Sequence, residues 1–61
     1  MRNEIEKKFK IRLAEFQYNK DENGKVIVLL RFEPGTPVNK AGAIARYVKN
    51  VYIVDKVQVF M

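Results

Sequence analysis

The feature that most constrains this chain is the stretch Lys25 to Glu33, which is apolar on both of its possible faces. In a strand, alternate residues point to opposite sides of the sheet. The stretch then presents two apolar rows: Val26, Val28, Leu30 and Phe32 on one side, and Ile27 and Leu29 on the other. A turn sequence precedes it and Pro34-Gly35 follows it, which bounds a single short strand. The pattern predicts a strand that is covered on both sides.

The segment before this strand predicts the other half of a hairpin. The connection from Asn19 to Gly24 ends in Asn-Gly, which tolerates the positive φ angles of tight hairpin turns. We therefore expect an extended chain over most of the range from Glu6 to Tyr18. The apolar alternation changes parity near Ala14, which indicates a β-bulge or a bend there.

A helical start is the alternative for the N-terminal segment. Asn3 followed three residues later by Glu6 matches a capping box. Ile5, Phe9 and Leu13 then recur at helical spacing on one face.

The C-terminal half predicts one helix and one strand. Thr36 and Pro37 are good residues for the N-cap and the first helical position, and apolar residues recur at helical spacing to about Lys49. Asn50 is the connector, and the range from Val51 to Phe60 is again apolar on both faces. We expect a third strand over that range.

These elements predict a single α+β domain over residues 1–61 with the order β-β-α-β. A β-α-β crossover makes the second and third strands parallel. The first strand is expected to be antiparallel to both and to lie between them. One helix covers one face of the three-stranded sheet.

The uncovered face of the sheet predicts a sheet-mediated homodimer, because exposed apolar patches of this kind usually mark interfaces. Sheet stacking or pairing of the C-terminal strands would both serve. The alternative is a monomer whose N-terminal helix covers the second face. The expected interface residues are Ile27, Leu29, Val51, Ile53, Val57 and Val59.

Charge points to nucleic acid as a partner. Twelve basic residues against seven acidic residues give a formal net charge of +5, and small basic proteins commonly bind phosphate backbones. In a strand, Lys8, Lys10 and Arg12 share one face, with an aromatic residue, Tyr18, further along. The helix offers a second basic face. The full set expected to bind DNA or RNA is Lys8, Lys10, Arg12, Tyr18, Lys40, Arg46, Tyr47 and Lys49.

Several function classes lack their usual residues. The chain contains no His, Cys or Ser, so serine–histidine and cysteine–histidine catalysis are impossible within it. Transition-metal sites lose their common ligands, and no motif indicates a cofactor. We expect a non-catalytic protein without metal or cofactor. The N-terminus has no signal-peptide pattern and no apolar run is long enough to span a membrane, so a cytoplasmic location is expected.

Two functions therefore remain in competition. The first is a small regulator that binds nucleic acid as a homodimer. The second is a protein-interaction module, such as an inhibitor or accessory subunit, that uses its sheet or an exposed strand edge.

Overall fold

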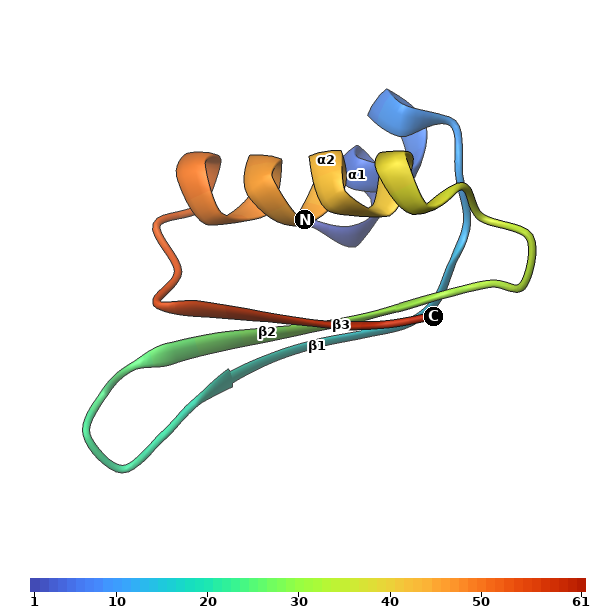
Figure 1. Cartoon of the computed structure of the whole chain (residues 1–61). Coiled ribbons are helices and arrows are strands. Elements are labelled where there is room, and N and C mark those ends of the chain that lie inside the picture. Colours follow the sequence, from blue (N-terminus) through green and yellow to red (C-terminus); the bar gives the residue numbers. More distant parts are fainter.

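The computed structural model describes all residues from 1 to 61 as a three-stranded mixed sheet with two helices on one face (Figure 1). The elements in chain order are α1 (Arg2–Phe9), β1 (Leu13–Lys20), β2 (Val26–Phe32), α2 (Val38–Val51) and β3 (Lys56–Phe60). β1 is antiparallel to β2, and β2 is parallel to β3. The α+β class and the parallel crossover are as predicted. β2 is the central strand, so the prediction that the first strand lies between the other two is wrong.

The β1–β2 hairpin forms where the Asn-Gly signal predicted it. Gly24 has a φ of 81°, and the Asp21 carboxylate accepts the backbone N–H groups of Asn23 at 2.8 Å and Lys25 at 2.9 Å. The pairing register shifts between Leu13 and Glu15, which places the predicted bulge at Ala14. Turn chemistry and parity therefore located both irregularities correctly.

The N-terminal segment is a helix, so the prediction of a strand from Glu6 onward is wrong for its first half. α1 ends at Phe9, and its C-cap, Lys10, adopts the left-handed conformation with φ 54° and ψ 48°. The capping box of the helical alternative does not form, because the helix already begins at Arg2. Glu6 instead accepts the Leu13 N–H at 2.8 Å, and Arg2 donates to the Leu13 carbonyl at 2.7 Å. These two bonds fix the connection between α1 and β1.

The end of α2 and the start of β3 also differ from the prediction. The expected N-cap side chain, Thr36, donates its hydroxyl to the Glu33 carbonyl at 2.8 Å, and α2 begins at Val38. α2 continues through Asn50 to Val51, so the strand expected from Val51 is shortened to five residues from Lys56. The reversal between them places Ile53 at a positive φ of 50°. Because such a conformation cannot belong to a strand, the apolar run before Asp55 is a turn.

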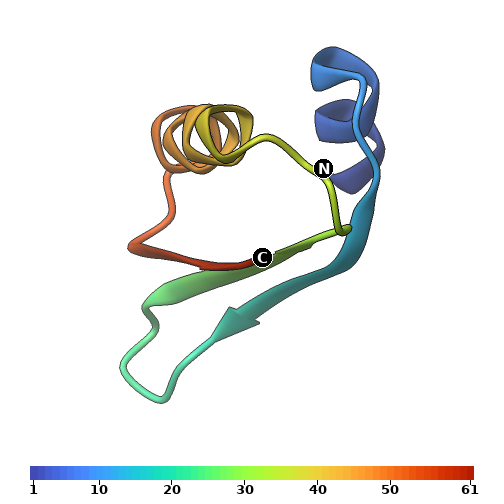
Figure 2. The same cartoon turned by 45° about the vertical axis from the view of Figure 1, so that its right-hand side comes forward.

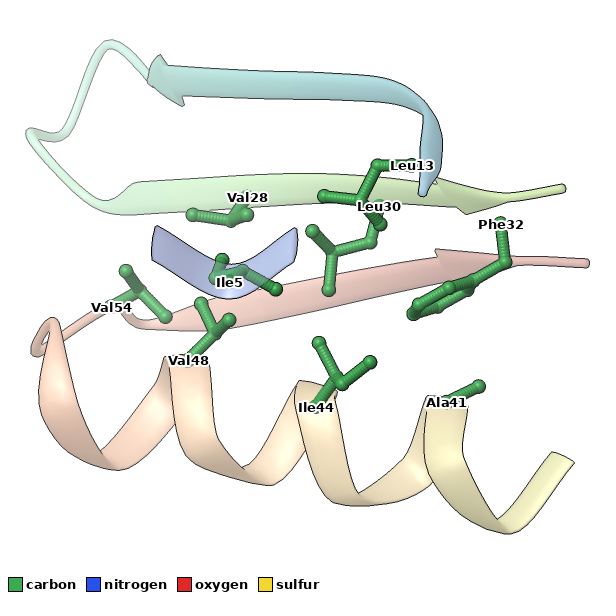
Figure 3. Packing of buried hydrophobic residues seen from close by; sticks show 9 residues of the cluster. All are labelled: Ile5, Leu13, Val28, Leu30, Phe32, Ala41, Ile44, Val48 and Val54. Atoms are coloured by element: carbon green, nitrogen blue, oxygen red, sulfur yellow. The ribbon is translucent and has the colours of Figure 1, made fainter. Parts of the chain in front are cut away.

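Both helices lie on the same side of the sheet, as Figure 2 shows. Nine buried side chains fill the space between the helices and the sheet (Figure 3), and β2 supplies Val28, Leu30 and Phe32 from one of its two apolar rows. They are Ile5, Leu13, Val28, Leu30, Phe32, Ala41, Ile44, Val48 and Val54. Neither helix is long and apolar enough to cross a membrane.

The second face of the sheet carries no helix. The prediction of a single covering helix is wrong, because there are two, but α1 does not cover the second face either. Ile27 and Leu29 lie half-buried on this open face. Leu29 lies between Gln17 of β1 and Gln58 of β3. The second apolar row of β2 therefore has no covering element within the folded chain.

Candidate nucleic-acid interface

The helix layer, formed by α1 and α2, is positively charged because its cations outnumber its carboxylates, and both carboxylates are already engaged. α2 contains no acidic residue. In α1, Glu6 holds Arg2 and the Leu13 N–H, and Glu4 accepts the Tyr52 hydroxyl at 2.8 Å. The only other ion pair of the chain joins Arg31 to Glu15 at 3.1 Å, on β2 and β1. Cations of the helix layer other than Arg2 therefore have no carboxylate partner within the chain.

Three of these unpaired cations line one hollow of about 440 Å³. Lys10 reaches it from the C-cap of α1, Arg12 from the connection to β1, and Lys40 from the first turn of α2. We call this site the basic hollow. Its lining residues are Lys10, Ile11, Arg12, Glu33, Pro34, Gly35, Thr36, Pro37 and Lys40.

The local chain geometry explains why the three cations meet. Lys10 turns the chain sharply after α1, and the Leu13 bonds to Glu6 and Arg2 hold the returning segment in place. The opposite wall is the turn before α2, where Gly35 adopts a φ of 93°. The N-terminal end of α2 adds the positive end of a helix dipole to the same region. One carboxylate, Glu33, lines the hollow against three cations, so an excess of positive charge remains.

Other expected contact residues lie elsewhere on the helix layer. The Lys8 ammonium sits 5.3 Å from the centre of the Tyr47 ring, which itself packs edge-to-face against Phe9 and Tyr52. Tyr47 therefore orders the contact between the helices, and its ring is already occupied. Lys8 itself makes no ion pair and stays exposed.

Tyr52 belongs to the same aromatic contact. Its hydrogen bond to the Glu4 carboxylate, aided by burial, raises the pKa of the phenol well above its usual value. The bond ties the C-terminal end of α2 to α1, since Tyr52 is the C-cap of α2 and Glu4 lies in α1. The two residues are 48 positions apart in the chain. It thus helps to hold the two halves of the helix layer together.

Arg46 and Lys49 line a second hollow, on the side of α2 that faces β3. Its volume is about 350 Å³, and we call it the edge groove. Its lining residues are Gly42, Ala45, Arg46, Lys49, Asp55, Lys56 and Val57. Tyr18 lies apart from both hollows: it pairs with Val28 toward the hairpin end of β1 and is 48% exposed.

The grouping of the cations expected from a strand is wrong. Lys8 lies on α1, Lys10 on its C-cap and Arg12 in the following connection, so the three do not form one face of a strand. The grouping of Lys10 and Arg12 with Lys40 depends on a contact between distant segments. The helical spacing of Ile5, Phe9 and Leu13 was the one signal that could have suggested it.

The residues expected at a dimer interface fall in three places. Ile27 and Leu29 lie on the open face, while Val51 and Ile53 are exposed around the α2–β3 connection. The remaining two, Val57 and Val59, lie on the helix side of β3, because they pair with Val28 and Leu30.

No side-chain group of this chain is arranged to hold a metal, since no three carboxylates cluster. Comparisons with protein-family models, curated proteins and solved structures find no match for the chain. The candidate function therefore depends on the geometry and charge of the site itself.

Proposed function

We propose that this protein binds the phosphate backbone of nucleic acid without catalysis, and that it acts as a homodimer. The observation that carries the proposal is the basic hollow, where three cations from three separate segments meet without an ion-pair partner. Binding phosphate there breaks no existing salt bridge. Release of counterions from the nucleic acid then supplies the driving force.

The conformation of Lys10 supports a role in binding. A left-handed residue at the end of a helix is usually Gly, because a side chain costs roughly 1 kcal/mol in that conformation. This chain places a lysine there instead, at the edge of the basic hollow. Sites that keep an unfavourable conformation are frequently functional.

The surface of α1 and α2 extends the same charge beyond the basic hollow. Lys8 lies over the junction of the two helices, and Arg46 and Lys49 lie on the far side of α2. Such a spread of cations suits contact with several phosphates along a backbone. It carries no arrangement of donors and acceptors that would read bases, so the proposal is for binding with little sequence preference.

The dimer is supported by what the fold leaves uncovered. A chain of 61 residues buries only nine side chains, all of them on one side of its sheet. Domains of this size are marginally stable alone and often gain stability from association. Two copies would also double the number of phosphate contacts.

Binding can be tested by titrating the protein against duplex DNA, single-stranded DNA and structured RNA over a range of salt concentrations. We expect wild-type affinity to fall steeply with salt for at least one of them. The double variant Arg12→Gln/Lys40→Gln removes two cations of the basic hollow and should reduce the slope of log K against log salt by about 1.8 on duplex DNA.

The matched control is Lys20→Gln/Lys25→Gln, which removes the same charge from the hairpin at the opposite end of β1 and β2. The control should keep most of the wild-type slope and affinity. Equal losses in the two double variants would show that net charge alone matters and that the basic hollow is not the site. Absence of binding by the wild type at low salt would refute the proposal altogether.

Lys10→Gly separates binding from folding. Glycine suits the left-handed C-cap, so we expect the variant to be at least as stable as the wild type while it binds nucleic acid more weakly. Unchanged affinity in this variant would remove Lys10 from the site.

A further inference from the structure

The outer edge of β3 is an unpaired strand edge beside an open groove. β3 is the last strand of the sheet, so it pairs with β2 only. Six of the eight large hydrophobic side chains that stay exposed belong to α2, to β3, to the connection between them or to the residue after β3. They are Val38, Val51, Ile53, Val59, Phe60 and Met61. An unpaired edge with exposed apolar residues is a template for another strand.

We propose that this edge pairs with β3 of a second copy, antiparallel and about a two-fold axis at Gln58, so that two sheets become one of six strands. The inference gives the homodimer proposed above a definite interface. The interface leaves out the basic hollow, because none of the residues that line the hollow belongs to β3.

The register follows from symmetry. In an antiparallel pair about a two-fold axis with both helix layers on the same side, opposed residues share a face. Only an axis at Gln58 then pairs all five residues of β3. Val57 lies opposite Val59 of the second copy on the helix side, and Gln58 lies opposite itself on the open face.

The same register gives the one charged residue of β3 a suitable partner. Lys56 falls opposite Phe60 of the second copy on the open face. Aromatic faces attract cations, and within the chain the Phe60 ring already has the Arg31 guanidinium 5.5 Å from its centre. The five opposed positions of β3 are therefore compatible with self-pairing.

The flank of α2 above this edge leaves room for a neighbouring helix. Gly42 and Ala45 line the edge groove, and a Cβ added at Gly42 would meet nothing within 4 Å. In the dimer the two α2 helices run side by side across the axis. Small residues at that position let helices approach closely, which large side chains would prevent.

The opposite edge of the sheet is less suited to pairing. β1 begins with the bulge at Ala14 and ends in Asn19 and Lys20, and both bulges and lysines discourage edge pairing. Two-fold pairing through β3 places both β1 edges on the outside. The assembly then closes as a dimer instead of extending into a fibre.

A charge swap at the axis tests the interface. Gln58→Lys puts two lysines opposite each other, and Gln58→Glu does the same with two carboxylates, so each variant should dimerise with a Kd raised by up to about fivefold. An equimolar mixture places lysine opposite carboxylate and should restore dimers. Sedimentation equilibrium measures the degree of dimerisation in all four samples: the wild type, the two variants and their mixture.

The matched control is Gln17→Lys. Gln17 and Gln58 flank Leu29 on the same open face, but Gln17 lies on β1. This variant should dimerise like the wild type, and circular dichroism of all variants checks that the fold is intact. A wild type that stays monomeric at millimolar concentration would overturn the inference, and so would equal weakening by Gln17→Lys and Gln58→Lys. Neither result removes the basic hollow from the nucleic-acid site, because Arg12→Gln/Lys40→Gln tests that site separately.

Discussion

Ile53 combines a side chain that is 86% exposed with a left-handed backbone conformation. A β-branched residue is rarely found in that conformation, which costs roughly 1 kcal/mol or more. Its side chain gains little in return, because it is exposed. We expect Ile53→Gly to raise the free energy of unfolding by up to about 1 kcal/mol in urea titrations at monomeric concentrations.

Val51→Gly is the matched control for Ile53. Val51 is also exposed but ends α2 in a helical conformation, so glycine relieves no strain there and lowers helix propensity. This variant should be less stable than the wild type. If both variants lose stability, the left-handed conformation of Ile53 is not a source of strain.

Tyr52 gives the helix layer a pH dependence of known sign. Its pKa is raised above the ordinary value of 10.0, chiefly by the hydrogen bond to Glu4. The bond therefore contributes its full stability below pH 10 and loses it as the phenol ionises at higher pH. Tyr52→Phe should cost about 1 kcal/mol at neutral pH and remove the last phenolate step in an alkaline absorbance titration.

The stability difference between Tyr52→Phe and the wild type should stay constant from neutral pH to about 10 and shrink above it. Tyr18→Phe is the control, because the Tyr18 hydroxyl donates no hydrogen bond within the chain. This variant should leave both the stability and the last phenolate step unchanged. If Tyr18→Phe lost the last phenolate step, that step would belong to Tyr18 and not to Tyr52.

At the scale of the elements, α1 is held in place mainly by one fully buried side chain. Ile5 is the only buried residue of α1 and it packs into the core with Val28 and Val48. Ile5→Ala should cost about 2–5 kcal/mol, a large part of the stability of a small domain. Chemical denaturation should show a correspondingly lower midpoint, whereas Lys7→Ala on the exposed side of α1 should change little.

β2 and α1 show what the local sequence could and could not predict. β2 was placed to within one residue at each end, because turn residues bound a continuous apolar run. The spacing of the apolar residues in the segment of α1 fits the period of a strand as well as that of a helix. The deciding interactions are the bonds from Glu6 to Leu13 and from Tyr52 to Glu4, which join separate elements. No local pattern contains them.

The candidate site also has a part that the sequence could predict and a part that it could not. The excess of basic residues and their exposure could be predicted from composition, but their grouping could not. Lys40 lies near Lys10 and Arg12 only because the connection after β2 starts α2 beside the end of α1. The edge groove was missed for a similar reason, since it depends on how α2 lies against the residues from Asp55 to Val57 and not on any motif.

At the scale of the whole molecule, the two proposed interactions should respond to salt in opposite directions. Each edge groove has three cations, Arg46, Lys49 and Lys56, against the single carboxylate of Asp55. Pairing two copies brings these groups together, and their repulsion weakens the dimer at low salt. Between about 20 mM and 300 mM salt the screening length shortens to less than 10 Å, so dimerisation should strengthen.

Nucleic acid should reverse that trend. Phosphates near both copies neutralise the same cations, so binding and dimerisation support each other, and by linkage each raises the affinity of the other equally. Nucleic-acid binding itself weakens as salt rises. We therefore expect sedimentation equilibrium to show the dimer weakest at low salt without nucleic acid, and strongest at low salt with a short duplex present. If dimerisation instead weakens with salt in the protein alone, attraction between opposite charges holds the copies together, and the β3 edge with its groove of cations cannot be the surface that joins them.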